Sequence, residues 1–438
     1  MDMTVDPAMR RRVVISSTLG NALEWFDFVV FGLFAGVIGK LFFPADNPSN
    51  SLLLTFATFG IAFAARPLGG LAFGIYADRY GRKRALVVMI MMMALGTGLI
   101  GFLPTYASIG IAAPILVLVA RLIQGFSAGG EFGSASAMLI EFATPGRRGL
   151  YGSWQMVSQS LAFGCGAVMA FLLNTQLSPE AFTSWGWRVP FLLGILIGPV
   201  GFYLRSKVDE SPEFKAFLDS RKGAARPNTP LKDVLGQFPR QLLVAFCVIA
   251  AGTAINYVGS VFMPAYAASV LGLKLADAQL GLVAVAFCGI FVALFGGWLS
   301  DKIGRRWVSL PALVLFCGLF YYFMTRLVAA PSREALWQLQ ACGLLLSLMA
   351  GPIPALMTEI FPVSMRSTGA SLMYNLAVML FGGLAPFTNT WLVQVTGDKA
   401  APIYYIFFAA LVGVLGLALH REVDRHGPVV AAAAAPAE

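Results

Sequence analysis

The sequence predicts an all-α membrane protein with twelve transmembrane helices in two pseudo-symmetric six-helix bundles. Three observations predict this fold: a shortage of charged residues, twelve long apolar runs, and a repeat between the two halves of the chain. Of the 438 residues, 58% are apolar and only 12% are charged, and the mean hydropathy is +0.75. A soluble domain carries roughly 25% charged residues, so most of this surface is expected to face lipid rather than water.

Each apolar run is long enough for a membrane-spanning helix, which needs about 20 residues. The runs are predicted near 13–39, 52–77, 85–104, 113–142, 150–174, 188–205, 240–270, 278–299, 307–328, 335–360, 367–395 and 402–420. The prolines inside them are acceptable because neighbouring membrane helices can satisfy the freed backbone groups; they are Pro67, Pro264, Pro354 and Pro386. The predicted units are an N-terminal bundle (1–205), a cytoplasmic linker (206–239), a C-terminal bundle (240–421) and a flexible tail (422–438).

The distribution of basic residues predicts the orientation of the chain in the membrane. Most of the 31 Lys and Arg residues lie before the first run, in alternate loops, in the segment 206–239 or at the C-terminus. Cytoplasmic loops carry an excess of Lys and Arg, so both termini are predicted to be cytoplasmic. The net charge of +9 therefore reflects orientation, and we expect no nucleic-acid partner.

Two sequence patterns recur in both halves. Gly74-Ile-Tyr-Ala-Asp-Arg-Tyr-Gly-Arg-Lys matches Gly297-Trp-Leu-Ser-Asp-Lys-Ile-Gly-Arg-Arg, and an acid–arginine pair with a spacing of seven residues also recurs. The glycines permit a tight turn, and the aspartate can accept hydrogen bonds from amides at a helix N-terminus. The alternative is that the basic residues only set orientation. The predicted conformational gate consists of Asp78, Arg82, Glu141, Arg148, Asp301, Arg305, Glu359 and Arg366.

With these motifs the chain resembles the major facilitator superfamily over essentially its full length. Further segments resemble the metabolite–proton symporter family of that superfamily: Gly20-Asn-Ala-Leu-Glu-Trp-Phe-Asp-Phe28, Arg66-Pro-Leu-Gly-Gly70, Arg121-Leu-Ile-Gln-Gly-Phe-Ser-Ala-Gly-Gly-Glu131 and Gly186-Trp-Arg-Val-Pro-Phe191. The loops Thr144–Gly149 and Thr396–Lys399 look most like those of citrate and tricarboxylate symporters. Proline/betaine members carry a long C-terminal coiled coil, whereas the tail after Arg425 has no heptads.

This resemblance implies a multi-pass protein of the bacterial inner membrane that takes up a small organic acid together with protons. Citrate or another tricarboxylate is the favoured substrate, and a dicarboxylate, an oxoacid or a zwitterionic osmolyte is the alternative. A sensor that kept the transport fold is a more remote alternative. The expected partners are the organic anion, protons and the bilayer, and the protein is expected to function as a monomer.

Enzyme chemistry finds little support in the sequence. Gly125-Phe-Ser-Ala-Gly129 matches the G-x-S-x-G nucleophile pattern, which needs a strand–helix elbow and a histidine base. Both histidines lie near the C-terminus, and the pattern falls inside a predicted helix, so close helix packing explains it better. The five cysteines share no metal-ligand spacing. We therefore expect no catalytic residue, no metal and no cofactor.

Five ionisable residues fall in the middle of predicted membrane helices: Glu24, Asp27, Arg66, Arg121 and Glu131. Each costs roughly 2.5–3.5 kcal/mol at the bilayer centre if it is unpaired, so a role beyond packing is expected. Glu24 and Asp27 lie on one helix face, and two close carboxylates favour the sharing of a proton. Asp27, Glu24 and Glu131 are the predicted proton-coupling residues, and the alternative is that they are structural partners of the arginines.

Arg66 and Arg121 are the cations that the sequence offers to an anionic substrate in the core. Neutral hydrogen-bonding residues on other helices complete the predicted site, although Tyr and Asn in membrane helices more often bond to a neighbouring helix. The predicted substrate-binding residues are Arg66, Arg121, Gln124, Gln155, Gln159, Asn256, Tyr257, Tyr374 and Asn375.

Overall fold

The computed structural model describes residues 7–45, 48–80, 82–206, 236, 238–361 and 366–420. Within these residues, twelve helical segments are long and apolar enough to cross a membrane. They span Pro7–Leu33, Asn50–Phe73, Arg84–Phe102, Ala112–Glu141, Arg148–Gln176, Gly186–Tyr203, Pro239–Ser269, Leu275–Ile303, Arg305–Ala329, Arg333–Glu359, Gly369–Thr396 and Pro402–Leu419. The predicted all-α, twelve-helix fold is thereby confirmed. Most of the predicted linker and the predicted tail lie outside the described residues.

The helices of the first half run from the N-terminus to Ser206. They are α1 (Pro7–Leu33), α2 (Ala35–Phe42), α3 (Pro48–Ala64), α4 (Arg66–Tyr80), α5 (Arg82–Phe102), α6 (Tyr106–Ile109), α7 (Ala112–Ala128), α8 (Glu131–Glu141), α9 (Arg148–Gly152), α10 (Trp154–Gln176), α11 (Pro179–Ser184), η1 (Gly186–Arg188), α12 (Val189–Gly194) and α13 (Ile197–Ser206). The first predicted span, 13–39, differs from the structure, because α1 begins earlier and the helix is interrupted at Phe34, before α2.

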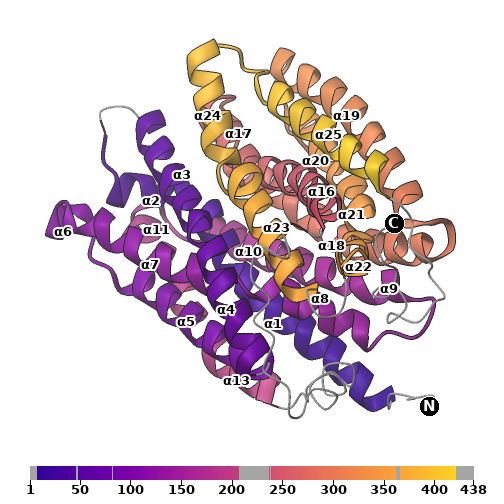
Figure 1. Ribbon diagram of the computed structural model, residues 1–438. Coiled ribbons are helices and arrows are strands. Elements are labelled where there is room, and N and C mark those ends of the chain that lie inside the picture. The colour runs from indigo at the N-terminus through magenta and orange to yellow at the C-terminus, as the bar shows by residue number, and fades with distance from the viewer. Residues whose placement is uncertain are drawn as a thin grey trace.

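The helices of the second half begin at Pro239. They are α16 (Pro239–Tyr257), η2 (Val258–Phe262), α17 (Met263–Ser269), α18 (Leu275–Ile303), α19 (Arg305–Ala329), α20 (Arg333–Ala341), α21 (Gly343–Ala350), α22 (Ile353–Glu359), α23 (Arg366–Ala377), η3 (Val378–Gly383), α24 (Ala385–Thr396) and α25 (Pro402–Leu419). Figure 1 shows α1–α13 on one side of the molecule and α16–α25 on the other.

The prolines explain several interruptions of the long spans. Pro264 and Pro386 stand in the first turn of α17 and α24, directly after the π-helical turns η2 and η3, and Pro354 stands in the first turn of α22. A first-turn position needs no N–H donor inside the helix, so proline is tolerated there. Two spans of the second half thus carry widened turns, η2 and η3. Such turns often accompany function.

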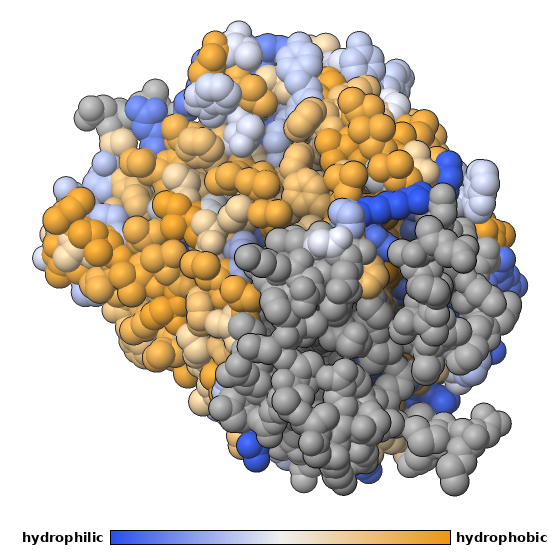
Figure 2. All heavy atoms as spheres, in the orientation of Figure 1, coloured by the Kyte–Doolittle hydropathy of each residue, from blue (hydrophilic) through white to orange (hydrophobic). Residues whose placement is uncertain are grey.

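Contacts across the midline hold the two halves together. Helix α10 packs against α18, α23 packs against α4 and α8, and α24 packs against α3. On the visible surface, apolar side chains cover a broad region and hydrophilic side chains gather toward its margins (Figure 2). Large apolar residues such as Phe102, Phe291 and Leu68 are 66–74% exposed, as expected for a surface that faces lipid.

Backbone-to-backbone packing in the first half depends on glycines. A Cβ added at Gly125 would overlap the carbonyl oxygen of Ala62 in α3, and one added at Gly69 would overlap the carbonyl oxygen of Phe126 in α7. Ser127, two residues after Gly125, lies inside α7 and donates a hydrogen bond to the carbonyl of Met89. The prediction that the G-x-S-x-G pattern serves close helix packing is confirmed by these contacts.

We expect Gly125→Ala to destabilise the protein by about 2 kcal/mol, because α3 and α7 must separate to admit the methyl group and overpacking typically costs 1–3 kcal/mol. The measurement is the melting temperature of detergent-purified protein, followed by tryptophan fluorescence. Gly318→Ala in α19 is the matched control, because an added Cβ there meets nothing within 4 Å. Equal melting temperatures for the two variants would contradict the close approach of α3 and α7.

Candidate functional site

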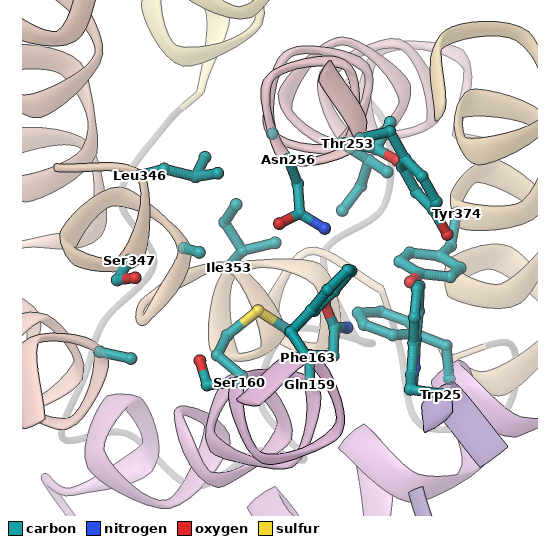
Figure 3. A pocket seen from close by; sticks show the side chains of 17 residues that line it. Trp25, Gln159, Ser160, Phe163, Thr253, Asn256, Leu346, Ser347, Ile353 and Tyr374 are labelled. Atoms are coloured by element: carbon teal, nitrogen blue, oxygen red, sulfur yellow. The ribbon is translucent and has the colours of Figure 1, made fainter. Parts of the chain in front are cut away.

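An open pocket with about 690 Å³ of empty space, part of it open to solvent, lies between the two halves of the molecule. We call it the first cavity. The first half contributes Trp25 from α1 and Gln159 from α10, and the second half contributes Asn256 from α16 and Tyr374 from α23. Figure 3 shows these side chains converging from both sides. Gln159, Asn256, Tyr257 and Tyr374 are therefore the predicted substrate-binding residues that reach this cavity.

A second cavity adjoins the first and shares part of its wall; its empty space of about 740 Å³ is also partly open to solvent. The residues that line both are Ser160, Phe163, Asn256, Leu346 and Ser347. From there the second cavity continues among α16, α18, α19 and α20, past Met263, Leu282 and Leu339. The two pockets therefore adjoin each other at these five residues.

Arg66 lies directly behind the wall of the first cavity and is 1% exposed. Its guanidinium carbon lies 5.7 Å from the centre of the Trp25 ring and 5.9 Å from that of Tyr374, and both rings line the cavity. Its Nε donates to Asn375 Oδ1 (3.1 Å) and its Nη2 to the carbonyl of Ala128 (3.3 Å). Cation–π contacts of this kind replace part of the hydration that a buried cation loses.

Arg121, in α7, is fully buried and is surrounded by aromatic rings. Its guanidinium carbon lies 4.3 Å from the centre of the Phe31 ring, 5.0 Å from Phe28 and 5.3 Å from Phe59. Nη1 donates to Gln124 Oε1 at 2.8 Å. Phe28 is shared, because its ring centre also lies 5.2 Å from the guanidinium carbon of Arg66.

Three buried guanidinium nitrogens have no hydrogen-bond partner among the described residues: Nη1 of Arg66, and Nε and Nη2 of Arg121. The hydroxyl of Tyr257, which lines the cavity, is also without such a partner. An unpaired buried donor costs about 1–3 kcal/mol, and more when it is charged. These donors are therefore available to an acceptor that enters from the cavity.

Asp27 belongs to a polar chain that crosses the interior of the first half. Arg121 donates to Gln124, Gln124 Nε2 donates to Thr97 Oγ1 at 2.8 Å, and Thr97 donates to Asp27 Oδ2. The other oxygen of Asp27 has no hydrogen-bond partner among the described residues, and its charge attracts that of Arg121. The structure thus joins the predicted proton carrier to a predicted anion-binding arginine.

The other two predicted proton-coupling residues are also buried. Glu24 is 4% exposed in α1, one turn before Asp27, and Glu131 is 1% exposed at the start of α8. Neither belongs to the chain from Arg121 to Asp27 as the hydrogen bonds define it. Asp27 is the one of the three for which a hydrogen-bonded link to Arg121 is described.

Five predicted substrate-binding residues do not line the first cavity: Arg66, Arg121, Gln124, Gln155 and Asn375. Asn375 instead bridges the halves, since it accepts from Arg66 and donates to the carbonyl of Gly129 at 2.5 Å. Gln155 is fully buried, and neither of its amide atoms has a hydrogen-bond partner among the described residues.

Sequence reasoning missed several residues of the site. Trp25 and Phe132 line the cavity, and Phe132 stacks on Tyr374 across the two halves with ring centres 3.7 Å apart. Thr97 holds Asp27. Trp25 lies within one of the motifs that resemble the symporter family. However, an aromatic residue or a single threonine in an apolar run does not by itself indicate a functional role.

The predicted gate contains one well-defined cluster at the ends of α18, α19 and α22. Arg305 Nη1 donates to Asp301 (2.7 Å) and its Nη2 to Glu359 (2.9 Å). Asp301 also accepts hydrogen bonds from the backbone N–H groups of Gly149 (2.7 Å) and Leu150 (2.9 Å) in the first half. Asp301 thus accepts from amides at the start of α9. The sequence predicts the same arrangement for Asp78, its counterpart in the first half, whose side chain lies outside the described residues.

The remaining gate residues are less fully described. Glu141 is buried at the end of α8 and Arg148 begins α9, beside the cluster around Asp301. The side chains of Asp78, Arg82 and Arg366 lie outside the described part of the chain. Within the described residues, no group of three His, Cys, Asp or Glu side chains is close enough to hold a metal ion.

This fold and site define a polytopic membrane protein with a central polar site between two halves. The sequence model of the Major Facilitator Superfamily matches residues 18–386 and, in a second match, residues 253–437. The chain belongs to this superfamily. A solved proton:xylose symporter of the superfamily has the same fold, with a TM-score of 0.76 at 16% identity, covering 94% of this chain and 95% of that one.

Two relatives are similar over almost the whole chain. The citrate–proton symporter of Klebsiella pneumoniae is 42% identical over 407 residues, which cover 92% of this chain and 90% of the relative. The proline/betaine transporter of Salmonella typhimurium is 33% identical over 436 residues, which cover 97% and 86%. The resemblance noted from the sequence motifs is confirmed at the level of the family.

We expect Asp301→Ala to loosen the contact between the halves, because Gly149 and Leu150 lose their acceptor and Arg305 loses an ion pair. Spin labels at Arg147→Cys and Ile303→Cys, both exposed positions, report this distance by double electron–electron resonance in a background without the five native cysteines. The distribution is expected to move to longer distances.

Asp277→Ala serves as the matched control, because Asp277 lies in the first turn of the same helix at its opposite end. The control is expected to keep the parental distribution. A parental distribution in Asp301→Ala would remove this aspartate from the gate.

Proposed function

We propose that the protein is a secondary active transporter that takes up citrate, or another tricarboxylate, together with protons. The observation that carries the proposal is the pair of buried arginines with unpartnered N–H groups beside an ionisable aspartate and a central cavity. The similarity to a citrate–proton symporter at 42% identity supports the choice of substrate.

The arginines suit a polycarboxylate for a physical reason. An uncompensated carboxylate in the membrane interior costs several kcal/mol, and a planar guanidinium can pair with it through two parallel hydrogen bonds. Trp25 and Tyr374 separate Arg66 from the cavity, so the substrate reaches this arginine when those rings shift. Gln159, Asn256 and Tyr257 then supply neutral hydrogen bonds from both halves.

Proton coupling follows from the position of Asp27. When it is ionised, its charge competes with the substrate for Arg121. When it is protonated, Arg121 is left with the substrate as its counter-ion. A proton and an anion therefore favour the same state, and this mutual preference is what coupled symport requires.

A zwitterionic osmolyte is the alternative substrate, and the proline/betaine relative makes it worth weighing. A quaternary ammonium group binds to the faces of aromatic rings. Here the rings of Trp25, Phe28 and Tyr374 already face a guanidinium, so a second cation would meet repulsion. This arrangement favours an anion.

We further propose the membrane location and orientation of the protein. The basic loops suit a bacterial inner membrane with both termini in the cytoplasm. The bundles 1–205 and 240–421 would rock about the central site, with 206–239 as linker and 422–438 as tail. The protein would function as a monomeric transporter and not as an enzyme. Its partners are the organic anion, protons and lipid.

We expect purified protein in proteoliposomes to accumulate labelled citrate when a proton gradient is imposed, and not with a sodium gradient alone. In Asp27→Asn we expect uphill accumulation to be lost while citrate counterflow continues in part, since exchange can proceed with a permanently neutral side chain. Both activities are measured by filtration in the same vesicles.

Uptake that needs sodium and survives collapse of the proton gradient would refute proton coupling. Accumulation by Asp27→Asn at the parental level would make Asp27 structural and direct the test to Glu24 or Glu131. Counterflow of proline or betaine but of no carboxylate would transfer the proposal to the osmolyte class.

We expect at least one of Arg66→Lys and Arg121→Lys to weaken citrate binding about tenfold or more, because lysine keeps the charge but loses the planar fork, and a charge-assisted hydrogen bond is worth about 1.5–3 kcal/mol. Binding is measured by calorimetry on detergent-purified protein. Arg326→Lys, at the exposed end of α19, is the matched control. Two well-folded variants with parental affinity would take the arginines out of the site.

A further inference from the structure

Thr97 occupies a singular position in α5, where it is fully buried. Its hydroxyl oxygen lies within hydrogen-bond distance of three groups on three different segments. These are Oδ2 of Asp27, the carbonyl oxygen of Met93 at 2.9 Å, and Nε2 of Gln124 at 2.8 Å. Two of them are acceptors when Asp27 is ionised, and the third is a donor.

A hydroxyl group has one hydrogen and two lone pairs. Gln124 occupies one lone pair, because its Nε2 can only donate. The single hydrogen of Thr97 can therefore point to Asp27 or to the Met93 carbonyl, but not to both. An ionised Asp27 carries no hydrogen, so Thr97 must donate to it in that state.

The protonated state permits the reverse arrangement. The carboxylic acid of Asp27 can donate its hydrogen to the second lone pair of Thr97. The hydroxyl hydrogen then turns to the carbonyl of Met93, four residues earlier in the same helix, which is a usual partner for a threonine. Each state leaves the hydroxyl of Thr97 and Oδ2 of Asp27 hydrogen-bonded, so neither of these two groups becomes an unpaired buried group.

The other described groups near Asp27 do not replace Thr97 as a partner that donates to the carboxylate and accepts from the carboxylic acid. Arg121 of α7 attracts Asp27 but cannot accept a hydrogen bond from it. Gly194 of α12 faces Oδ1, with an added Cβ 3.1 Å from that atom, and presents no side chain. Of the other described acids close in sequence or packing, Glu24 precedes Asp27 on α1 and Glu131 begins α8, which packs against α1.

We infer that Thr97 is a two-state positioning residue whose hydroxyl reverses its hydrogen bond as Asp27 gains and loses the transported proton. The inference rests on the proposed role of Asp27 as proton carrier. The same hydroxyl is the link through Gln124 to Arg121. Thr97 thereby keeps Asp27 connected to Arg121 by hydrogen bonds in both protonation states.

The test compares Thr97→Val, which keeps the shape without the hydroxyl, with Thr97→Ser, which restores the hydroxyl. Proton-driven citrate accumulation is measured in proteoliposomes as a function of external pH. The ionised carboxylate loses a charge-assisted hydrogen bond, whereas the acid loses a weaker neutral one. We therefore expect the alkaline limb of the profile in Thr97→Val to move up by about one pH unit, and that of Thr97→Ser to match the parent.

Thr55→Val in α3 is the matched control, because Thr55 is equally buried but donates to the carbonyl of Ser51 within its own helix. Its profile is expected to stay parental. Thr97→Ala gives the same expected shift and replaces the valine variant if the latter does not fold.

The outcomes separate this inference from the proposed function. A parental pH profile in Thr97→Val, while Asp27→Asn is uncoupled, overturns the role of Thr97 and leaves the transport proposal standing. Equal shifts in Thr97→Val and Thr97→Ser also overturn it, because the hydroxyl would then be irrelevant. Parental accumulation in Asp27→Asn removes the proton carrier itself, and the inference falls with it.

Discussion

The cost of burying charge in an apolar interior governs the organisation of this protein. Arg66 and Arg121 are almost completely buried, where an unpaired charge costs roughly 2.5–3.5 kcal/mol on insertion scales. The structure offsets this cost with aromatic ring faces, a carbonyl oxygen and two amides rather than with a full set of counter-ions. The incomplete offset leaves N–H groups free for an acceptor, which is the physical basis of the proposed site.

The two halves contribute differently to that site. The first half supplies the buried charges, while the second half supplies neutral groups such as Asn256, Tyr257 and Asn375. Arg66 of the first half donates a hydrogen bond to Asn375 of the second half, so this arginine contributes to the contact between the halves. Any movement that separates α23 from α4 must break this bond, and an entering carboxylate can replace the lost acceptor. In the proposed mechanism, this one guanidinium links substrate binding to movement of the halves.

Close backbone packing occurs within the first half and also between the two halves. Gly69, Gly125 and Gly129 bring backbones of the first half so close that no side chain fits between them. The contacts between the halves include hydrogen bonds and stacked rings, namely the amides of Gly149 and Leu150 on Asp301 and the stacking of Phe132 on Tyr374. They also include a close backbone approach, because a Cβ added at Gly149 would lie 2.4 Å from the carbonyl oxygen of Gly297. Hydrogen bonds and stacked rings can be exchanged at little cost, whereas interlocked backbones cannot.

The sequence by itself determined the fold class, the spans and the family, because lipid imposes a hydropathy pattern and a loop charge bias that are local and can be read residue by residue. It also singled out Asp27, Arg66 and Arg121, since a charge in an apolar run is conspicuous. Only the tertiary structure decided which residues meet. Thr97 and Trp25 gain their roles from helices far apart in the chain, and Gln155 and Asn375 prove to lie away from the cavity. Helix rotation and pairing decide such contacts, and these depend on packing among all the helices rather than on any one segment.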